Sequence, residues 1–383
     1  MWINLLVIFI TIAFGVYFQQ SEKIVYVSTK TGEKRKLIIS RRKHYVILVS
    51  ILLILQSGLR NVAVGADTYA YYEAFERVKY MSWAEIFDSF KLYYQLGEGK
   101  DPGYLIFQKV IQLVVSNYQV YLILIAVMFF SALGDFVFKN TKQITDVMFA
   151  FVLYSTLFYS FFSITGIRQT IATVATLWSF NYIRRNKLFN FVILLLLAST
   201  IHKSVLIFIP IYFIRNKKAV KYLLISFAVL LPLVFYYSEI ISVFFQGFDD
   251  NYGVYEHMKD LKPYNYVILN LVIFFLGVFT YKDSLMQRER DTWFWYAALL
   301  IATFFTTQVF QIHGFMRVIY YFSIFNLLLI PHMFQLIAIK QRISHLRLLT
   351  LGLLALLSLY IYANYGSEYK FFWQEMALGT NYK

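Results

Sequence analysis

The chain contains no cysteine. Disulfides, thiolate nucleophiles and cysteine-bound metals are therefore excluded, which is compatible with work on an oxidising face of a membrane. Charge is also scarce, because only 15% of the residues are charged whereas 59% are hydrophobic and 20% aromatic. A soluble protein of 383 residues needs far more polar surface than this. The composition therefore indicates an integral membrane protein.

Several functional signals are missing as well. No Gly-x-x-x-x-Gly-Lys-Ser/Thr motif is present, which argues against ATP-driven work. Predicted outer loops lack Asp-x-Asp, the chain lacks His-x-x-x-His, and we expect neither a metal nor another cofactor. Residues 1–20 lack a basic segment and a cleavage site, so we expect a first membrane helix there rather than a signal peptide. The alternating pattern of an outer-membrane barrel is also absent.

Apolar segments separated by short basic connections make up most of the chain. They predict an all-α fold: one polytopic transmembrane helical bundle over residues 1–383, with about 12 crossings. The expected spans are 3–18, 44–59, 118–138, 146–164, 167–183, 188–201, 203–214, 220–237, 265–281, 292–311, 317–338 and 345–363. A further segment, 103–116, is apolar but short and carries Lys109 and Gln112; it would add one re-entrant segment or crossing.

The net charge is +15, and the placement of the basic residues along the chain fits the positive-inside rule of membrane proteins rather than nucleic-acid binding. If residues 24–43 are cytoplasmic, every second connection falls inside, and those connections hold most of the 36 lysines and arginines. Both termini are then predicted outside. Two outer loops, about 60–102 and 238–264, are large enough to carry function. The first contains residues 83–90, whose apolar spacing predicts a helix along the membrane surface.

Three arginine-centred clusters lie at predicted outer ends of apolar segments. They contain Arg60 with Asp67 and Tyr71, Arg168 with Gln169, and His313 with Arg317. Charge at such a position is costly and is usually retained for a task. A guanidinium offers bidentate donors to phosphate, and a carboxylate can bind a sugar hydroxyl. The alternatives are structural: a salt bridge in the first cluster, an arginine snorkelling to headgroups in the second and a helix cap in the third.

The predicted spans 188–201 and 203–214 are too short to cross a hydrocarbon layer of roughly 30 Å. They meet at His202, Lys203 and Ser204. We expect a shallow helical pair whose polar apex lies inside the bundle and lines a cavity. His202 could act there as a base or as a donor to a phosphate oxygen, with Lys203 adding charge. The alternative is a hydrogen-bonded structural histidine.

These groups suit a reaction on an anionic, lipid-linked donor. Fixed positive charge would stabilise a leaving phosphate while a sugar hydroxyl attacks. Arg168 and Arg317 are predicted to clamp the pyrophosphate. His202 or Lys203 would assist, and Asp67 would orient or deprotonate the acceptor hydroxyl.

Four motifs follow one another along the chain. They are Arg60-Asn-Val-Ala-Val-Gly65-Ala-Asp67-Thr-Tyr69-Ala-Tyr71-Tyr72, Asp101-Pro-Gly103-Tyr104, Gly166-Ile-Arg168-Gln169-Thr-Ile-Ala172 and Ile201-His202-Lys203-Ser204. Together they resemble the EpsG family of bacterial exopolysaccharide proteins, relatives of the Wzy-type O-antigen and capsule polymerases. The similarity covers most of the chain. One departure is Ala66, where the family pattern has Thr.

The resemblance implies a GT-C-like helical fold and a glycosyltransferase of the outer face of the bacterial cytoplasmic membrane. Such enzymes join oligosaccharide repeat units carried on undecaprenyl pyrophosphate, without a nucleotide sugar or a required metal. The expected partners are this lipid-linked oligosaccharide and the bilayer, and a chain-length regulator and a flippase are further candidates; no nucleic acid is expected.

By the family pattern, Arg60, Asp67, Arg168 and His202 fall on the family's motif residues. With the clusters above, the predicted catalytic residues are Asp67, Arg168 and His202. The predicted binding residues for pyrophosphate or glycan are Arg60, Tyr71, Gln169, Lys203, His313 and Arg317.

Three other functions stay open. An O-antigen-ligase-like enzyme would share the arginine and histidine chemistry but usually carries one very large outer loop, whereas the two loops here are moderate. A GT-C transferase of single sugars often carries acidic pairs in its first outer loop, which are not evident between Arg60 and Pro102. A non-enzymatic transporter of polysaccharide or lipid-linked glycan would favour inverted repeats, and the sequence shows none.

Overall fold

A computed structural model describes residues 2–21, 23–28, 34–39, 41–65, 67–214, 217–237, 264–286, 292–309, 314–343, 345–365 and 368–375. Within these ranges the fold is helical, as predicted, apart from one antiparallel hairpin of β1 (Lys23–Ser28) and β2 (Lys34–Ile39) that the all-α prediction did not include. Nearly all of the predicted loop 238–264 lies outside the described residues.

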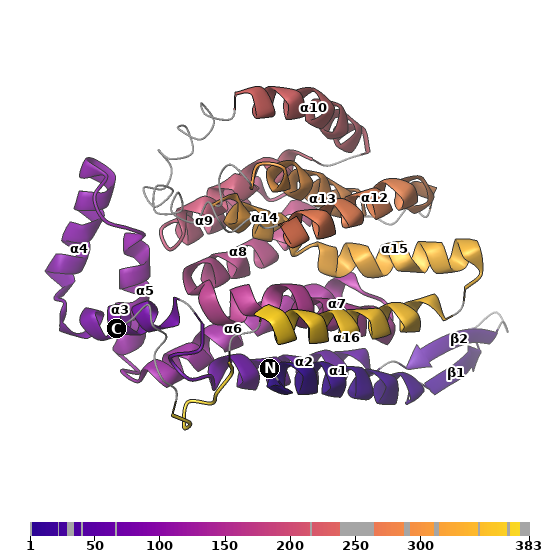
Figure 1. Cartoon of the computed structure of the whole chain (residues 1–383), viewed down its shortest axis with the longest axis horizontal. Helices are drawn as coiled ribbons and strands as arrows, with labels where there is room; N and C mark the ends of the chain where they lie inside the picture. Colours follow the sequence, from indigo (N-terminus) through magenta and orange to yellow (C-terminus); the bar gives the residue numbers. More distant parts are fainter. Residues whose placement is uncertain are drawn as a thin grey trace. The chain divides into compact units, whose positions relative to one another are not determined.

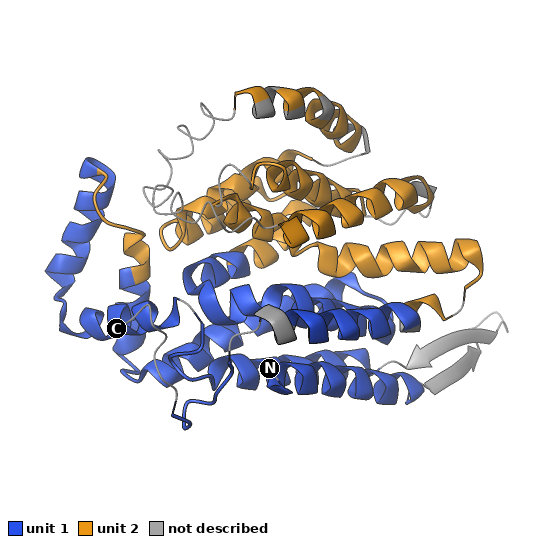
Figure 2. Ribbon diagram, viewed as in Figure 1, with its two compact units in different colours: residues 1–96, 105–174, 348–383 blue, residues 97–104, 175–347 orange. Residues whose placement is uncertain are grey.

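The chain forms two compact units that interleave along the sequence (Figure 2). The first comprises residues 1–96, 105–174 and 348–383, and the second comprises residues 97–104 and 175–347. The single integral membrane domain expected over residues 1–383 stays a prediction.

The first unit is built on long helices that run alongside one another (Figure 1). These are α1 (Trp2–Gln20), α2 (Arg42–Gly58), α6 (Tyr118–Asn140), α7 (Ile144–Leu153) and α16 (Leu346–Tyr365). The backbones of α2 and α6 approach closely, because a Cβ added at Gly134 would lie 2.7 Å from the Ser50 Oγ. Small residues at such a crossing are the usual means of packing membrane helices tightly.

The predicted loop 60–102 folds into α3 (Thr68–Tyr80), α4 (Trp83–Lys91) and the π-helical turn η1 (Leu92–Leu96). Helix α4 confirms the helix expected at 83–90. It starts where Ser82 and Glu85 satisfy each other's backbone N–H groups in a capping box. The helix therefore begins at a residue that the local sequence determines.

Helix α5 (Pro102–Gln112) occupies the short segment expected at 103–116. Its polar residues reach the carbonyls at the end of α3: Lys109 Nζ lies 3.1 Å from the oxygens of Val78 and Lys79, and Gln112 Nε2 lies 2.7 Å from that of Phe75. A lysine at this position adds donors to the carbonyls at the C-terminal end of a helix. These contacts explain two polar residues in an otherwise apolar segment.

Two π-helical turns, η2 (Tyr154–Phe158) and η3 (Ser160–Thr165), follow α7 and lead into α8 (Ile167–Arg184). Such turns are rare and occur frequently at functional sites. The Gly166 N–H donates to the Phe161 oxygen at 2.7 Å, and the Thr170 N–H donates to the Gly166 oxygen at 2.7 Å. The start of α8 is thus held by backbone hydrogen bonds.

The second unit contains the rest of α8 from residue 175, together with α9 (Leu188–Ser199), the 3-10 helix η4 (Lys203–Phe213), α10 (Lys217–Tyr236), α12 (Tyr264–Met286), α13 (Thr292–Thr306), α14 (Phe315–Ser323) and α15 (Asn326–Gln341). Its core includes three buried rings: the ring centre of Phe294 lies 4.8 Å from that of Phe180 and 5.0 Å from that of Phe325. Helix α9 and η4 pack together, which confirms the short helical pair expected around His202.

Among the described residues, three helices are long and apolar enough to cross a bilayer: α1, α6 and residues Tyr264–Ser284 of α12. Helices α14 and α15, which are bent by 54°, make a fourth candidate if they form one span. Several other apolar helices are shorter. The apolar helices indicate a membrane protein, whereas the 12 crossings and the GT-C-like arrangement stay predictions.

Candidate functional site

Arg60 lies just beyond α2 with its side chain buried, and only 3% of the residue is exposed. Its guanidinium donates to the backbone carbonyl oxygen of Ser57 at 2.5 Å and to that of Ile164 in η3 at 3.4 Å. Burial lowers the pKa of Arg60, although an arginine remains charged at neutral pH. Its electrostatic neighbours are tyrosines: Tyr118, Tyr159, Tyr369 and Tyr154. The cation thus ties the end of α2 to the turn that precedes α8.

The C-terminal segment 368–375 packs against the same end of α2. The Tyr369 hydroxyl donates to the Gln56 oxygen, and the Phe372 N–H donates to the Leu59 oxygen at 2.9 Å. Arg60 and Phe371 form an isolated antiparallel bridge. The environment of Arg60 is therefore assembled from three separate parts of the chain.

Asp67 occupies a different environment from Arg60. It is exposed and immediately precedes α3, and its carboxylate does not cap that helix. Within the described ranges, the structure contains no salt bridge that joins Arg60 to Asp67, so the salt bridge considered for this cluster is not formed. The loop between them is tight at Gly65, whose φ of +101° places it in the left-handed region.

Arg168 and Gln169 lie in the first turn of α8. The guanidinium carbon of Arg168 lies 5.9 Å from the ring centre of Tyr71, within the range of a cation–π contact. Arg168 is half-buried, whereas Gln169 is 2% exposed. The structure therefore brings two predicted site residues, Arg168 and Tyr71, together within the first unit.

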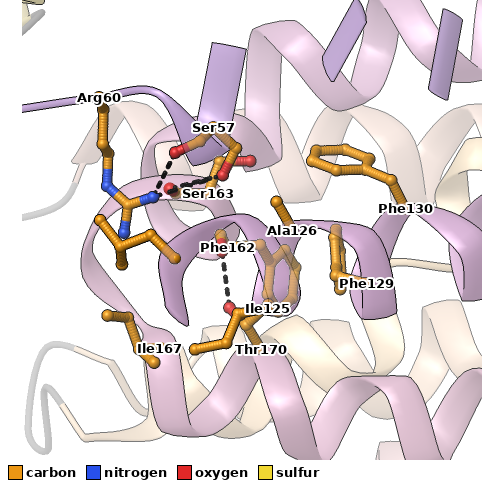
Figure 3. A pocket seen from close by; sticks show the side chains of 11 residues that line it. Ser57, Arg60, Ile125, Ala126, Phe129, Phe130, Phe162, Ser163, Ile167 and Thr170 are labelled. Atoms are coloured by element: carbon orange, nitrogen blue, oxygen red, sulfur yellow. Dashed lines mark hydrogen bonds between the residues drawn. The ribbon is translucent and has the colours of Figure 1, made fainter. Parts of the chain in front are cut away.

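A small pocket lies beside the Arg60 side chain (Figure 3). Its polar lining consists of Ser57, Arg60, Ser163 and Thr170, and Phe129 and Phe130 are among its apolar residues. The Ser57 hydroxyl donates to the backbone carbonyl oxygen of Ser163 at 3.1 Å. Arg60 and Ser57 are hydrogen-bonded to each other here, so the pocket wall is held in place by its own polar groups.

His202 and Lys203 are placed by the second unit, where His202 directly precedes η4. His202 is buried at 5% exposure, as expected for the apex of the short helical pair, and Lys203 is half-buried. The Nδ1 of His202 lies 3.6 Å from the Oδ2 of Asp101, a carboxylate from the loop 97–101. Asp101 was not among the predicted site residues.

Tyr321 lies near both Asp101 and Arg317. Tyr321 lies one helical turn after Arg317 on α14, and it interacts electrostatically with both Arg317 and Asp101. The Ser204 hydroxyl lies 3.4 Å from the same tyrosine oxygen. The second unit thus groups His202, Asp101, Tyr321 and Arg317. His313 lies outside the described residues.

Two signals in the sequence could have identified the residues that were missed. Asp101 is an acidic residue next to Pro102 and Gly103 in one of the four motifs, but a separation of about 100 residues hides its contact with His202. Tyr321 has the four-residue helical spacing from Arg317 that places side chains on one face. Metal clusters of three or more His, Asp or Glu side chains are not found in the described part of the chain.

A model of the EpsG family matches residues 43–375. The match covers most of the chain and includes every candidate residue named above. It confirms the resemblance drawn from the four motifs. No curated protein and no solved structure matches the chain.

Proposed function

The chain belongs to the EpsG family, and from that premise we propose that it is a membrane polysaccharide polymerase. It joins oligosaccharide repeat units carried on undecaprenyl pyrophosphate at the outer face of the bacterial cytoplasmic membrane. The product is an exopolysaccharide or a capsule. The family match over residues 43–375 supports this proposal.

The reaction is a glycosyl transfer. A hydroxyl oxygen of the acceptor sugar forms a bond to the anomeric carbon of the donor, and the bond between that carbon and the pyrophosphate oxygen breaks. The pyrophosphate leaves with the bonding electron pair, and the hydroxyl proton passes to a base. The protein must therefore supply positive charge for the leaving group and an acceptor for one proton.

Arg168 carries the proposal, because its side chain combines charge, access and orientation. Its guanidinium is half-buried in the first turn of α8 and lies over the Tyr71 ring. The N-terminus of a helix favours anions, and a guanidinium binds phosphate oxygens in a bidentate manner. We assign Arg168 to the donor pyrophosphate, with Gln169 next to it and Tyr71 contacting the glycan.

The second unit supplies the other groups. His202 is proposed as the base that takes the acceptor proton, because a nitrogen of a neutral imidazole can accept a proton. Arg317 and Lys203 are proposed to bind anionic oxygens of the substrate. Asp67 is exposed, and we assign it to orienting the acceptor sugar. His313 keeps its proposed role in substrate binding.

Arg60 is proposed to position other groups rather than to bind substrate. Its guanidinium already donates to the carbonyls of Ser57 and Ile164. A multi-pass bundle of about 12 crossings with both termini outside, on a GT-C-like plan, remains our proposal for the membrane arrangement. A chain-length regulator and a flippase are the proposed protein partners.

Deletion of the protein followed by analysis of glycan bands tests the proposal. Loss of a polymerase leaves single repeat units, loss of a flippase leaves none exposed, and loss of a ligase leaves polymer on the carrier lipid. Complementation with Arg168→Ala should give the pattern of the deletion although the protein is present in the membrane. Long polymer from cells that lack the protein would contradict the proposal.

A direct assay uses purified protein and the lipid-linked glycan fraction extracted from the deletion strain. A polymerase converts this fraction into a ladder without added nucleotide. If the fraction is unchanged although the protein is folded and the complemented strain makes polymer, the protein is not the polymerase.

A further inference from the structure

We propose that Asp101 is the positioning residue of His202, and that it holds the imidazole in the tautomer required for proton transfer. The proposal rests on the proposed function, because it assigns Asp101 a role in the same reaction. The juxtaposition that motivates it lies entirely within the second unit. Asp101 comes from the loop before α5, and His202 comes from the apex between α9 and η4.

The contact pairs a buried carboxylate with a buried imidazole. The Oδ2 of Asp101 and the Nδ1 of His202 are 3.6 Å apart, and only 7% and 6% of the two side chains are exposed. An ionised carboxylate is costly to bury unless a donor or a positive charge faces it. At 3.6 Å the contact is electrostatic rather than a hydrogen bond. A proton on Nδ1 presents positive charge to the carboxylate, whereas a lone pair on Nδ1 would face it with negative charge. The carboxylate therefore favours the tautomer with the proton on Nδ1.

The backbone around Asp101 is held in an uncommon conformation. Asp101 has a φ of 46°, in the left-handed region that non-glycine residues seldom adopt. Its carbonyl accepts the Tyr104 N–H at 2.9 Å. Strain of this kind persists where the surrounding structure enforces it, and it clusters at functional sites.

Gly103 anchors this loop against the histidine-bearing connection. Its N–H donates to the Thr200 oxygen at 3.0 Å. A Cβ at Gly103 would lie 2.8 Å from the carbonyl carbon of Thr200, so only glycine allows this approach. On the other side, the His202 N–H donates to the Ala198 oxygen at 3.0 Å. Main-chain hydrogen bonds therefore hold the backbone at His202 itself and at Gly103, two residues after Asp101.

The tautomer decides which nitrogen can act as a base. With the proton on Nδ1, the lone pair lies on Nε2, which can accept the proton of the acceptor hydroxyl as the glycosidic bond forms. The imidazolium that results carries a positive charge next to Asp101, and the carboxylate stabilises it without taking the proton. The proton returns to solvent or to the departing pyrophosphate after transfer. No other reactant is needed.

Asp101→Asn tests the proposal, because it keeps the shape of the side chain and removes the charge. We expect kcat on the extracted lipid-linked glycan to fall about 10- to 100-fold with little change in KM. His202→Gln should lower kcat by about 10²- to 10⁴-fold. Asp101→Glu, which restores a carboxylate, should recover part of the rate.

The double variant separates positioning from a purely structural role. If Asp101 acts through His202, adding Asp101→Asn to His202→Gln should change kcat by no more than about twofold. If Asp101 only stabilises the fold, Asp101→Asn should leave kcat per folded molecule unchanged, and if it acts independently of His202, the two losses should multiply. Either result would overturn the proposal. Rates are expressed per folded protein, measured by size-exclusion chromatography in detergent. If Asp101→Asn does not yield folded protein, the same cycle is run with Asp101→Glu.

A matched control is Asp88→Asn on α4. Asp88 is an exposed carboxylate paired with Lys91, and its substitution should leave kcat unchanged. If wild-type protein does not extend the lipid-linked glycan, the proposed function fails. If wild-type protein and Asp88→Asn extend it and Asp101→Asn does so at the same rate, only the role of Asp101 fails.

Discussion

Arg60 and Arg168 are both arginines of the first unit, but the structure uses them differently. Arg60 is 3% exposed and donates to two carbonyl oxygens, whereas Arg168 is half-buried and lies over an aromatic ring. The residues look alike in sequence, because each follows a glycine and an apolar residue at the end of an apolar segment.

The difference shows how the surroundings of a guanidinium decide its role. The Arg60 guanidinium donates to the carbonyl oxygens of Ser57 in α2 and Ile164 in η3, and these bonds join the two elements. Removing the side chain removes this donor from both buried oxygens. Arg168 instead lies over the Tyr71 ring, and we propose that its guanidinium binds a phosphate. Substitution of Arg60 should therefore lower mainly the stability of the protein, whereas substitution of Arg168 should lower mainly its activity.

Among substitutions in the first unit, the largest effect is expected for Arg168→Ala. Loss of a donor that stabilises a leaving phosphate should lower the rate of polymer formation by about 10²- to 10³-fold. The thermal unfolding temperature in detergent should stay close to that of the wild type. Arg168→Lys keeps the charge but not the bidentate geometry and should retain an intermediate rate. Normal chain length in cells carrying Arg168→Ala would contradict the assignment.

Arg60→Ala should act on stability instead. Two hydrogen bonds from a charged donor are lost and their acceptors stay buried, so we expect the protein to be destabilised by about 2–3 kcal/mol. The expected readout is a lower unfolding temperature and less protein in the membrane. The rate per folded molecule should change far less than for Arg168→Ala. A strong loss of rate at unchanged stability would move Arg60 into the substrate site.

Gly65→Ala tests the packing around Ile164, the residue whose carbonyl accepts from Arg60. Gly65 has a φ of +101°, and an added Cβ would collide with the side chain of Ile164, whose carbonyl accepts from Arg60. The cost should be about 1–3 kcal/mol, seen as a lower unfolding temperature. Gly97→Ala is the matched control, because Gly97 also has positive φ but nothing lies within 4 Å of its added Cβ. Equal losses would show that backbone strain alone is responsible.

The smallest effect is expected at Tyr71. Tyr71→Ala removes the ring under Arg168 and should raise KM by about two- to fivefold, equivalent to about 0.5–1 kcal/mol. Tyr71→Phe keeps the ring face and should behave like the wild type in the same assay. If Tyr71→Phe fails as badly as Tyr71→Ala, the hydroxyl rather than the ring contributes the interaction.

Local sequence was sufficient for most helices. The spans expected at 118–138 and 167–183 correspond to α6 and α8, because long apolar segments can satisfy their backbone only as helices in a membrane. Capping by Ser82 and Glu85 likewise sets the start of α4. The hairpin of β1 and β2 was missed, because the segment was assigned to a cytoplasmic connection by its basic residues although its strands are rich in β-branched residues.

The candidate site was predictable only in part. Motifs identified Arg168 and His202 through residue type and position, and the structure adds Tyr71 beside the first and Asp101 beside the second. Neither contact follows from spacing, because the partners lie about 100 residues apart. The carbonyl contacts of Arg60 were equally hidden.

The sequence by itself determined that this is a helical membrane protein of the EpsG family, because hydrophobic runs and short motifs are local properties of the chain. Tertiary structure alone decided that Arg60 donates to the Ser57 and Ile164 carbonyl oxygens, that Arg168 lies over Tyr71 and that Asp101 faces His202. The role of a charged side chain depends on the groups packed around it, and those groups come from distant segments that only folding brings together.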